Sequence, residues 1–313
     1  MDGHETVSVV VTTYEKRRFP DLKELLVTLK SQEHKHLEVI IVVERALELA
    51  KWLEDYCRLN LQCSWKVLFN EGKPGISGSR NIGIDHAQGE VIAFVDDDVL
   101  LPPGWIQAVL STFEKEDIGA VTGGAEPLWT GEHMNWLPTS LLWLVGSTTW
   151  YKKPAGTETR SVWGMNMAFT HNVFSSGIRF PERLGGVFGS RLHGEEQIVC
   201  FSIRHNLERR IVYAPSTVVL HKVYPYRYHP YFFLKSSYDM GATRRMLTQL
   251  YGSRDVLQLD TSLVAQMVLD GILDSLPLFS HSARLALKRI MMTCAVLLAA
   301  MTGYVLSYRP SAT

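Results

Sequence analysis

The sequence predicts an α/β fold built on a doubly wound, mostly parallel central sheet. Residues 7–12, 37–43 and 65–69 are short, mainly apolar runs of the kind found in strands buried on both faces. Between these runs, residues 21–31 and 46–59 repeat apolar side chains at helical spacing, which predicts crossover helices. The alternation of strand and helix indicates βαβ units and therefore a parallel sheet.

A fourth apolar run, 91–95, ends in three consecutive carboxylates, Asp96, Asp97 and Asp98. Adjacent negative charges at the end of a buried strand repel one another unless a cation neutralises them. A hard divalent cation, Mg²⁺ or Mn²⁺, together with a phosphate-bearing substrate, would meet this need. The alternative is a helix N-cap cluster or a solvated turn, because aspartate is common in both.

The overall composition narrows the function class. The chain has 313 residues, with 32 lysines and arginines against 32 aspartates and glutamates, so no global basic field indicates a nucleic-acid partner. Its four cysteines form no CxxC pair, which predicts reduced thiols in a cytosolic compartment. The N-terminus leads directly into a predicted strand, so we expect no signal peptide. The length suits one large domain with an appendage, or two domains.

A glycine-rich loop, 72–81, opens a predicted helix at 81–88 that leads into the strand with the aspartates. The loop matches neither the P-loop nor the dinucleotide-binding fingerprint. Residues 126–156 show no clean period and predict a long functional or mobile loop. The other elements expected before residue 221 are helices at 105–116 and 197–207 and strands at 119–123, 163–169, 210–214 and 217–220.

Several short motifs follow one another in a fixed order along the chain. They are Thr12-Thr13-Tyr14-Glu15, the acid Glu44 after the second strand, Ser79-Arg80-Asn81 with Gly83, the run Gly89 to Asp98, Gly164 with Asn166, the pair Glu195-Glu196, and Ala214-Pro215 with His221. From about residue 7 to residue 221, this series resembles family 2 glycosyltransferases of the inverting GT-A type. A second set of motifs more narrowly resembles archaeal enzymes that extend dolichyl-phosphate-linked sugars, of the glucosyl-dolichyl phosphate glucuronosyltransferase type. This set comprises Leu137-Pro138, Trp143 to Gly146, Gly194-Glu195-Glu196, His221-Lys222-Val223 with Tyr226-Arg227, and the apolar C-terminus.

The resemblance implies that an acceptor hydroxyl group attacks the anomeric carbon of a UDP-sugar with inversion. A positioned carboxylate takes the hydroxyl proton in such a reaction, and Glu196 occupies the matching position with Glu195 beside it. The family usually has aspartate at this position and after the second strand, whereas Glu196 and Glu44 are one methylene longer. The structural alternative is that two acids simply stabilise the dipole at a helix N-terminus.

The resemblance also implies a donor site with a divalent cation. Asp98 would ligate Mg²⁺ or Mn²⁺ and His221 would complete the metal or diphosphate site, although a lone histidine is more often a surface or core residue. The expected nucleotide-binding residues are Thr12, Tyr14 and Glu44 near uracil, Asp96 near ribose, Asp97 beside it, and Lys73 and Arg80 near the diphosphate. The expected acceptor or sugar residues are Trp163, Asn166, Lys222 and Arg227. Alternatively, Trp163 is simply a buried residue, and Lys73 and Arg80 lie in a solvated loop without contacting a ligand.

The C-terminal third predicts contact with a membrane. Residues 224–233 mix aromatic and basic side chains, which suits a membrane interface, a stacking surface or a core. Residues 263–279 predict an amphipathic helix on a membrane or a partner. Residues 290–308 lack charge and are near the minimum length for a transmembrane helix, the alternative being a buried helix. More bases precede this segment than follow it, which predicts a catalytic domain on the cytoplasmic face: Arg284, Lys288 and Arg289 against Arg309.

We therefore expect three regions. Residues 1–223 form a catalytic domain, with a nucleotide-sugar half at 7–123 and an acceptor half at 124–223. An interfacial, amphipathic helical region follows at 224–283, and a transmembrane or membrane-anchoring helix at 284–313. The expected function is metal-dependent, inverting transfer of a hexose or hexuronate, for example glucuronate, from a UDP-sugar to a dolichyl- or polyprenyl-phosphate-linked saccharide at the cell membrane. One alternative is a synthase of polyprenyl-phosphate monosaccharides, with lipid phosphate as nucleophile. The other is a catalytically silent module that binds sugar nucleotides.

Overall fold

The computed structural model describes residues 5–72, 74–115, 117–184 and 193–307. The chain divides into two compact units. Unit 1 comprises Met1–Glu126, Lys152–Arg191 and Glu195–His221, and unit 2 comprises Pro127–Tyr151, Leu192–Gly194 and Lys222–Thr313. The domain limits expected from the sequence stay predictions.

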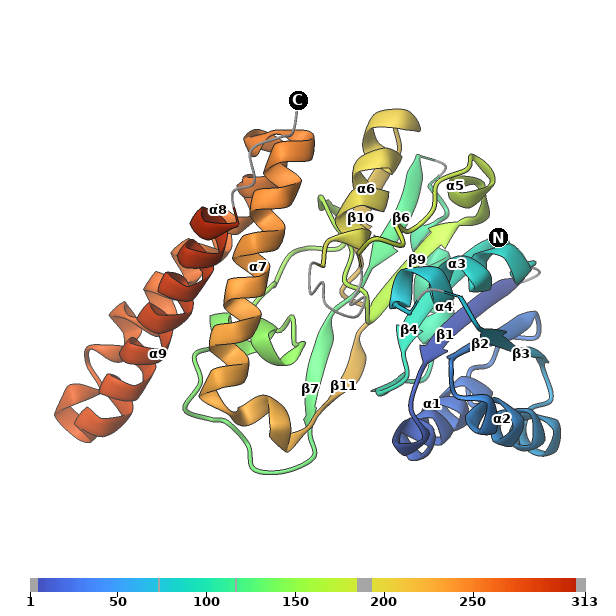
Figure 1. Cartoon of the computed structure of the whole chain (residues 1–313), viewed down its shortest axis with the longest axis horizontal. Coiled ribbons are helices and arrows are strands. Elements are labelled where there is room, and N and C mark those ends of the chain that lie inside the picture. Colours follow the sequence, from blue (N-terminus) through green and yellow to red (C-terminus); the bar gives the residue numbers. More distant parts are fainter. Residues whose placement is uncertain (1–4, 73, 116, 185–192, 308–313) are drawn as a thin grey trace. The chain divides into compact units, whose positions relative to one another are not determined.

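Unit 1 is built on an eight-stranded sheet with strand order β3-β2-β1-β4-β9-β6-β10-β8 (Figure 1). Most neighbouring strands are parallel, whereas β9 runs antiparallel to β4 and β6, and β8 runs antiparallel to β10. This arrangement confirms the expected α/β class with a mostly parallel sheet. The strands are β1 (Val7–Thr13), β2 (Leu37–Glu44), β3 (Ser64–Asn70), β4 (Val91–Asp96), β6 (Ile118–Thr122), β8 (Thr157–Glu158), β9 (Asn166–Thr170) and β10 (Arg210–Tyr213).

Two hydrophobic clusters, one on each face of the sheet, account for the continuous apolar runs. Alternate residues of a strand point to opposite faces, so Val9 packs with α1, α2 and α4, while Val10 packs with α3, α5 and α6. A strand covered by helices on both sides needs apolar residues at every position, which is the signal that the sequence carried. The helices of unit 1 are η1 (Lys16–Arg18), α1 (Phe19–Lys30), α2 (Leu47–Asn60), α3 (Ile76–His86), α4 (Trp105–Thr112), α5 (His171–Ser175) and α6 (Glu195–Asn206).

Two element boundaries differ from the sequence expectation in ways that matter for the site. Helix α3 begins at Ile76 inside the expected glycine-rich loop, because Gly75, with φ 135°, lets the chain turn into the helix there. The strand expected at 217–220 lies at β11 (Val219–Val223), so His221 is inside a strand rather than after it. Backbone pairing with Val99 of β5 (Val99–Leu100) extends the strand over this position.

A second, three-stranded sheet has the order β5-β11-β7, with β7 at Ala125–Trp129. Strand β11 pairs antiparallel with β5, which places His221 opposite Val99, the residue that follows Asp98. The chain passes from unit 1 to unit 2 within β7 and again within β11. The small sheet therefore brings a histidine from late in the chain to the end of the aspartate strand.

Unit 2 is helical. Its elements are η2 (Thr139–Val145), η3 (Pro225–Tyr228), α7 (Pro230–Tyr251), α8 (Ser253–Gly271), η4 (Leu273–Ser275) and α9 (Phe279–Leu306). The segment expected as a long loop contains η2, whose Leu141 and Leu144 pack in a core with Phe233 and Met267. The helix expected over 263–279 ends at Gly271, a residue with low helix propensity, and is followed by η4.

One buried carboxylate of unit 1 provides a stability prediction. Glu38 of β2 accepts hydrogen bonds from Lys66 Nζ (2.7 Å), Gln88 N (2.9 Å) and Ser8 Oγ. Burial alone would raise the pKa of Glu38, but these hydrogen bonds outweigh burial and lower it. A group with a lowered folded-state pKa stabilises the fold above its unfolded pKa, and this contribution is lost as pH falls through the folded pKa.

Glu38→Gln should therefore lower the thermal midpoint at neutral pH, because charge-assisted hydrogen bonds worth about 2 kcal/mol are weakened. The difference from the wild type should shrink below about pH 4.3, where the unfolded carboxylate takes up its proton. Thermal unfolding, followed by circular dichroism over a pH series, measures the thermal midpoint of the variant and its pH-dependent difference from the wild type. Glu33→Gln, an exposed change in the same unit, is the control. A deficit that stays constant down to acid pH would contradict the assignment.

Candidate active site

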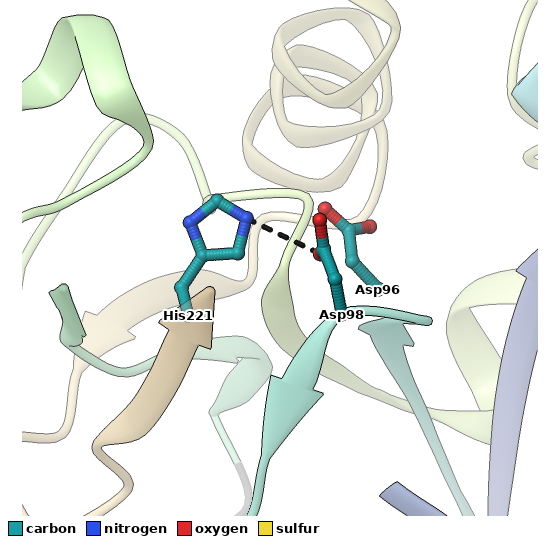
Figure 2. A group of neighbouring side chains, drawn as sticks. All are labelled: Asp96, Asp98 and His221. Carbon is teal, nitrogen blue, oxygen red and sulfur yellow. Dashed lines mark ion pairs between the residues drawn. The ribbon is translucent and has the colours of Figure 1, made fainter. Parts of the chain in front are cut away.

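The carboxylate cluster lies where the carboxyl ends of β1 and β4 meet. Asp96 pairs with Thr12 across these strands, and the chain then turns through the buried residues Asp97 and Asp98 into β5. Figure 2 shows Asp96, Asp98 and His221 facing one another. One ligand atom from each lies within 4.8 Å of those of the other two, and His221 Nε2 is 3.3 Å from Asp98 Oδ1. The structure thus brings together residues that are far apart in the chain.

Asp98 and His221 are buried, Asp96 is half-buried, and the carboxylates lie close enough to influence one another electrostatically. Burial, and then the charge of Asp98, raise the pKa of Asp96, and the same causes raise the pKa of Asp97 to about 7. Thr13 Oγ1 donates to Asp97 Oδ2 at 2.6 Å. Neighbouring buried carboxylates favour a cation between them. Two carboxylates and an imidazole are donors that Mn²⁺ and Mg²⁺ accept, so the described residues fit a divalent cation.

Arg18 is a member of this site that the sequence reasoning missed. Its guanidinium NH1 lies 2.8 Å from Asp98 Oδ2 and 3.8 Å from Asp97 Oδ1. The sequence feature that could have indicated Arg18 is the basic run Lys16-Arg17-Arg18, which forms η1 shortly after the carboxyl end of β1. Bases are common in exposed loops, so only the fold shows that Arg18 points back at the aspartates.

The two candidate base residues, Glu195 and Glu196, form the start of α6 and share one buried cation. Arg80 NH1 of α3 lies 2.9 Å from Glu196 Oε1 and 3.5 Å from Glu195 Oε1. The guanidinium also lies over the Phe180 ring, 5.3 Å from its centroid. A side chain at Gly164 would overlap both Glu196 Oε1 and Arg80 NH2, so the glycine leaves room for the pair. Both glutamates are therefore held by a side chain, in addition to any effect of the helix dipole.

Arg80 was expected beside the diphosphate, and the structure places its guanidinium against the two glutamates. Its charge also lowers the pKa of Asp96, against the larger raising effects of burial and Asp98. A contact of Arg80 with a diphosphate stays a prediction. Lys73, the other base expected there, lies outside the described residues.

The residues expected near uracil lie along the same edge of the sheet. Thr12 is near the end of β1, the following Tyr14 is exposed, and Glu44 ends β2 and accepts a hydrogen bond from Gly75 N at 3.0 Å. Strands β1 and β2 are parallel neighbours, so their ends meet on one side. Ligands bind at the carboxyl edge in open parallel sheets, and this edge also carries Asp96.

The residues expected to bind acceptor or sugar fall in both units. Asn166 is buried and bonded within unit 1: its Oδ1 accepts from Trp105 Nε1 at 3.2 Å, and its Nδ2 donates to the carbonyl oxygens of Gly124 and Thr217. Trp163 is half-buried against Tyr213. Lys222, which is buried, and Arg227, which donates to Val145 O at 3.2 Å, belong to unit 2. Their roles stay predictions.

Comparison with known proteins is decisive at the level of family. The model of glycosyl transferase family 2 matches residues 8–185, more than half of the chain. The chain belongs to glycosyl transferase family 2. This family 2 protein is 29% identical over 250 residues to the glucosyl-dolichyl phosphate glucuronosyltransferase of Haloferax volcanii, and the match covers 78% of each chain. It is a glycosyltransferase.

Solved structures show the fold of this glycosyltransferase. The mannosyltransferase PcManGT from Pyrobaculum calidifontis, in complex with GDP-Man and Mn²⁺, aligns with a TM-score of 0.63 at 16% identity, over 98% of this chain and 90% of that one. The S. aureus TarS fragment 1–349, in complex with UDP-GlcNAc, aligns with a TM-score of 0.52 at 15% identity, over 96% and 90%. The expected GT-A fold is confirmed.

Proposed function

We propose that this glycosyltransferase moves a hexose or hexuronate, for example glucuronate, from a UDP-sugar to a dolichyl- or polyprenyl-phosphate-linked saccharide, with inversion at the anomeric carbon. The observation that carries the proposal is that unit 1 contains both a carboxylate–histidine cluster with the donor groups for a cation and a separately held carboxylate pair. Inverting transfer needs both, one for the leaving group and one for the nucleophile. The similarity to the Haloferax glucuronosyltransferase supports the choice of donor and acceptor class.

The donor is assigned to the carboxyl edge of the sheet. Thr12, Tyr14 and Glu44 face the uracil, and Asp96 holds the ribose. Asp98 and His221 would hold Mg²⁺ or Mn²⁺, with Arg18 adding fixed positive charge next to Asp98. When bound, the cation offsets negative charge developing on the departing diphosphate.

Glu196 is assigned as the general base. A sugar hydroxyl group is a weak nucleophile unless a positioned carboxylate takes its proton as the new bond forms. Arg80 bonds Glu196 through Oε1, which fixes the orientation of the carboxylate and leaves the second oxygen for the acceptor hydroxyl. Glu195, more deeply buried beside it, takes part in holding this geometry.

The acceptor assignment includes a membrane, with the catalytic domain on its cytoplasmic face. Among the described residues, one helix, Phe279–Leu306, is long and apolar enough to cross a bilayer, and only 17% of its most apolar window is buried. The bases Arg284, Lys288 and Arg289 precede its uncharged part and suit the anionic surface of the cytoplasmic leaflet.

A transfer assay tests the function. The full chain, with Mn²⁺, is offered UDP-glucuronate or UDP-glucose and either a glucosyl-phosphodolichol analogue or dolichyl phosphate. We expect transfer to the lipid-linked saccharide, with a β-linked product from the α-linked donor, read by NMR. Transfer to dolichyl phosphate alone would instead support the monosaccharide-lipid synthase. Binding of UDP and Mn²⁺ without turnover across the acceptor panel would support the silent module.

A further inference from the structure

One side of α9 carries an uninterrupted exposed stripe. The backbone departs from helical geometry at Ser282, and the stripe lies in the regular part beyond it. Its members are spaced by three and four residues, so they share one face, and all are exposed: Arg284, Leu287, Met291, Cys294, Leu298, Met301 and Val305. Apart from the arginine at its start, the stripe contains no charged side chain, and α9 contains no acidic residue. We name these seven residues the α9 stripe.

The opposite face of α9 is covered by protein. Its buried residues, Ala286, Thr293, Val296 and Gly303, repeat at the matching spacing. Glycines allow a close approach to α7: a side chain at Gly241 would overlap the backbone of Ala300, and one at Gly303 would overlap the backbone of Tyr238. Figure 1 shows α9 lying alongside α7. The two helices therefore pack as a pair.

Helix α7 has a polar character that conflicts with a position inside a bilayer. It carries the ion pair Lys235–Asp239, with 2.6 Å between Nζ and Oδ2, and the adjacent bases Arg244 and Arg245. Arg245 lies 5.4 Å from the ring centroid of Tyr304, within the uncharged part of α9. If α9 crossed the membrane while packed in this way, α7 would bring these charges into the hydrocarbon, where charged groups are costly.

We propose that α9 lies in the plane of the membrane interface, with the α9 stripe in the lipid and α7 on the protein side, rather than crossing the bilayer. The occupant of the stripe is an anionic lipid surface. Its apolar members match the acyl boundary, and Arg284 at its end, in a helix whose only charges are cationic, matches anionic headgroups. The inference rests on the proposed lipid-linked acceptor, and it specifies which face of unit 2 meets the membrane.

Flotation of the full chain with mixed phosphatidylcholine–phosphatidylglycerol vesicles tests the surface. Leu298→Glu should weaken vesicle partition roughly 10-fold or more, since a charge is placed within the apolar part of the stripe. Leu59→Glu, at a more exposed leucine of α2, is the matched control and should change little. Equal partition of the Leu298 variant and the wild type would overturn the proposal.

Depth measurement separates the in-plane helix from a transmembrane one. Nitroxide labels are placed one at a time at Leu287→Cys, at the native Cys294 and at Val305→Cys. Cys63 is replaced by serine throughout, and Cys294 is replaced by serine in the two variants with an introduced cysteine. An in-plane helix gives similar depths at the three positions. A span gives the greatest depth near Cys294 and shallower labels at both ends, and would overturn the proposal.

Two further readouts complete the test. If the α9 stripe joins two copies instead, sedimentation without lipid would show a dimer that Leu298→Glu dissociates, and this would overturn the proposal.

Transfer to a water-soluble, short-chain acceptor should be the same in Leu298→Glu and wild type. In-plane binding by a protein that is inactive on every lipid-linked acceptor would refute the proposed function while supporting the membrane geometry.

Discussion

Asp98→Asn should abolish the Mn²⁺-dependent part of UDP binding. Asp98 is buried between Asp96, His221 and Arg18, and replacing it removes the charge that a divalent cation needs at the centre of the cluster. Since even outer-shell changes cost 10–100-fold in metal affinity, the loss of a direct ligand should reduce Mn²⁺-supported UDP affinity by roughly 100-fold or more. Isothermal titration of UDP, with and without Mn²⁺, measures the effect.

Asp85→Asn provides the matched control for this prediction. Asp85 has the same side chain in the same unit, but it is exposed on α3 and pairs with Arg179 at 2.9 Å. Its replacement should leave both titrations unchanged. If Asp98→Asn keeps the full Mn²⁺-supported affinity and the wild-type thermal midpoint, the assignment of Asp98 as a metal ligand fails.

Glu196→Gln should reduce the rate of sugar transfer while sparing donor binding. Glutamine keeps the size of the side chain and can still accept from Arg80, but it cannot take the acceptor proton. A lost general base costs roughly 10²-fold or more in kcat. Steady-state kinetics with the lipid-linked acceptor, and separate titration of UDP, resolve the two effects.

Glu195→Gln is the comparison that separates base from scaffold. Glu195 is one residue away, is buried and shares the same arginine, at 3.5 Å instead of 2.9 Å. If Glu196 is the base, its variant should lose more activity than the Glu195 variant at a similar thermal midpoint. Activity that survives Glu196→Gln would favour lipid phosphate as nucleophile, because a phosphate needs no strong base.

Local pattern was sufficient to predict most strands of the sheet and the aspartates of the candidate active site. The apolar runs of β1, β2 and β4 report burial on both faces, because desolvation acts on each position of a strand separately. The three aspartates were informative for the same reason, since charge at the end of such a run demands a partner. The order of motifs then predicted family and fold, both of which the comparisons confirm.

The family resemblance predicted His221 beside Asp98, whereas Arg18 was missed. The pairing of β11 with β5 brings His221 to Asp98, and Arg18 turns toward the aspartates because η1 follows β1 at the sheet edge. Arg80 contacts Glu196 because α3 and α6 pack on the same face of the sheet. Contacts of this kind depend on crossings between elements, which leave no periodic signal in the chain.

The same division holds for the C-terminal region. The sequence by itself determined that residues 290–308 are uncharged and that bases precede them, because hydropathy is a property of each residue. It left open whether this segment spans a bilayer or packs as a helix. Tertiary structure decided that α9 packs against the charged helix α7, through backbone contact at Gly241 and Gly303. Hydropathy measures what a helix can tolerate, whereas its neighbours decide which of its faces remains available to lipid.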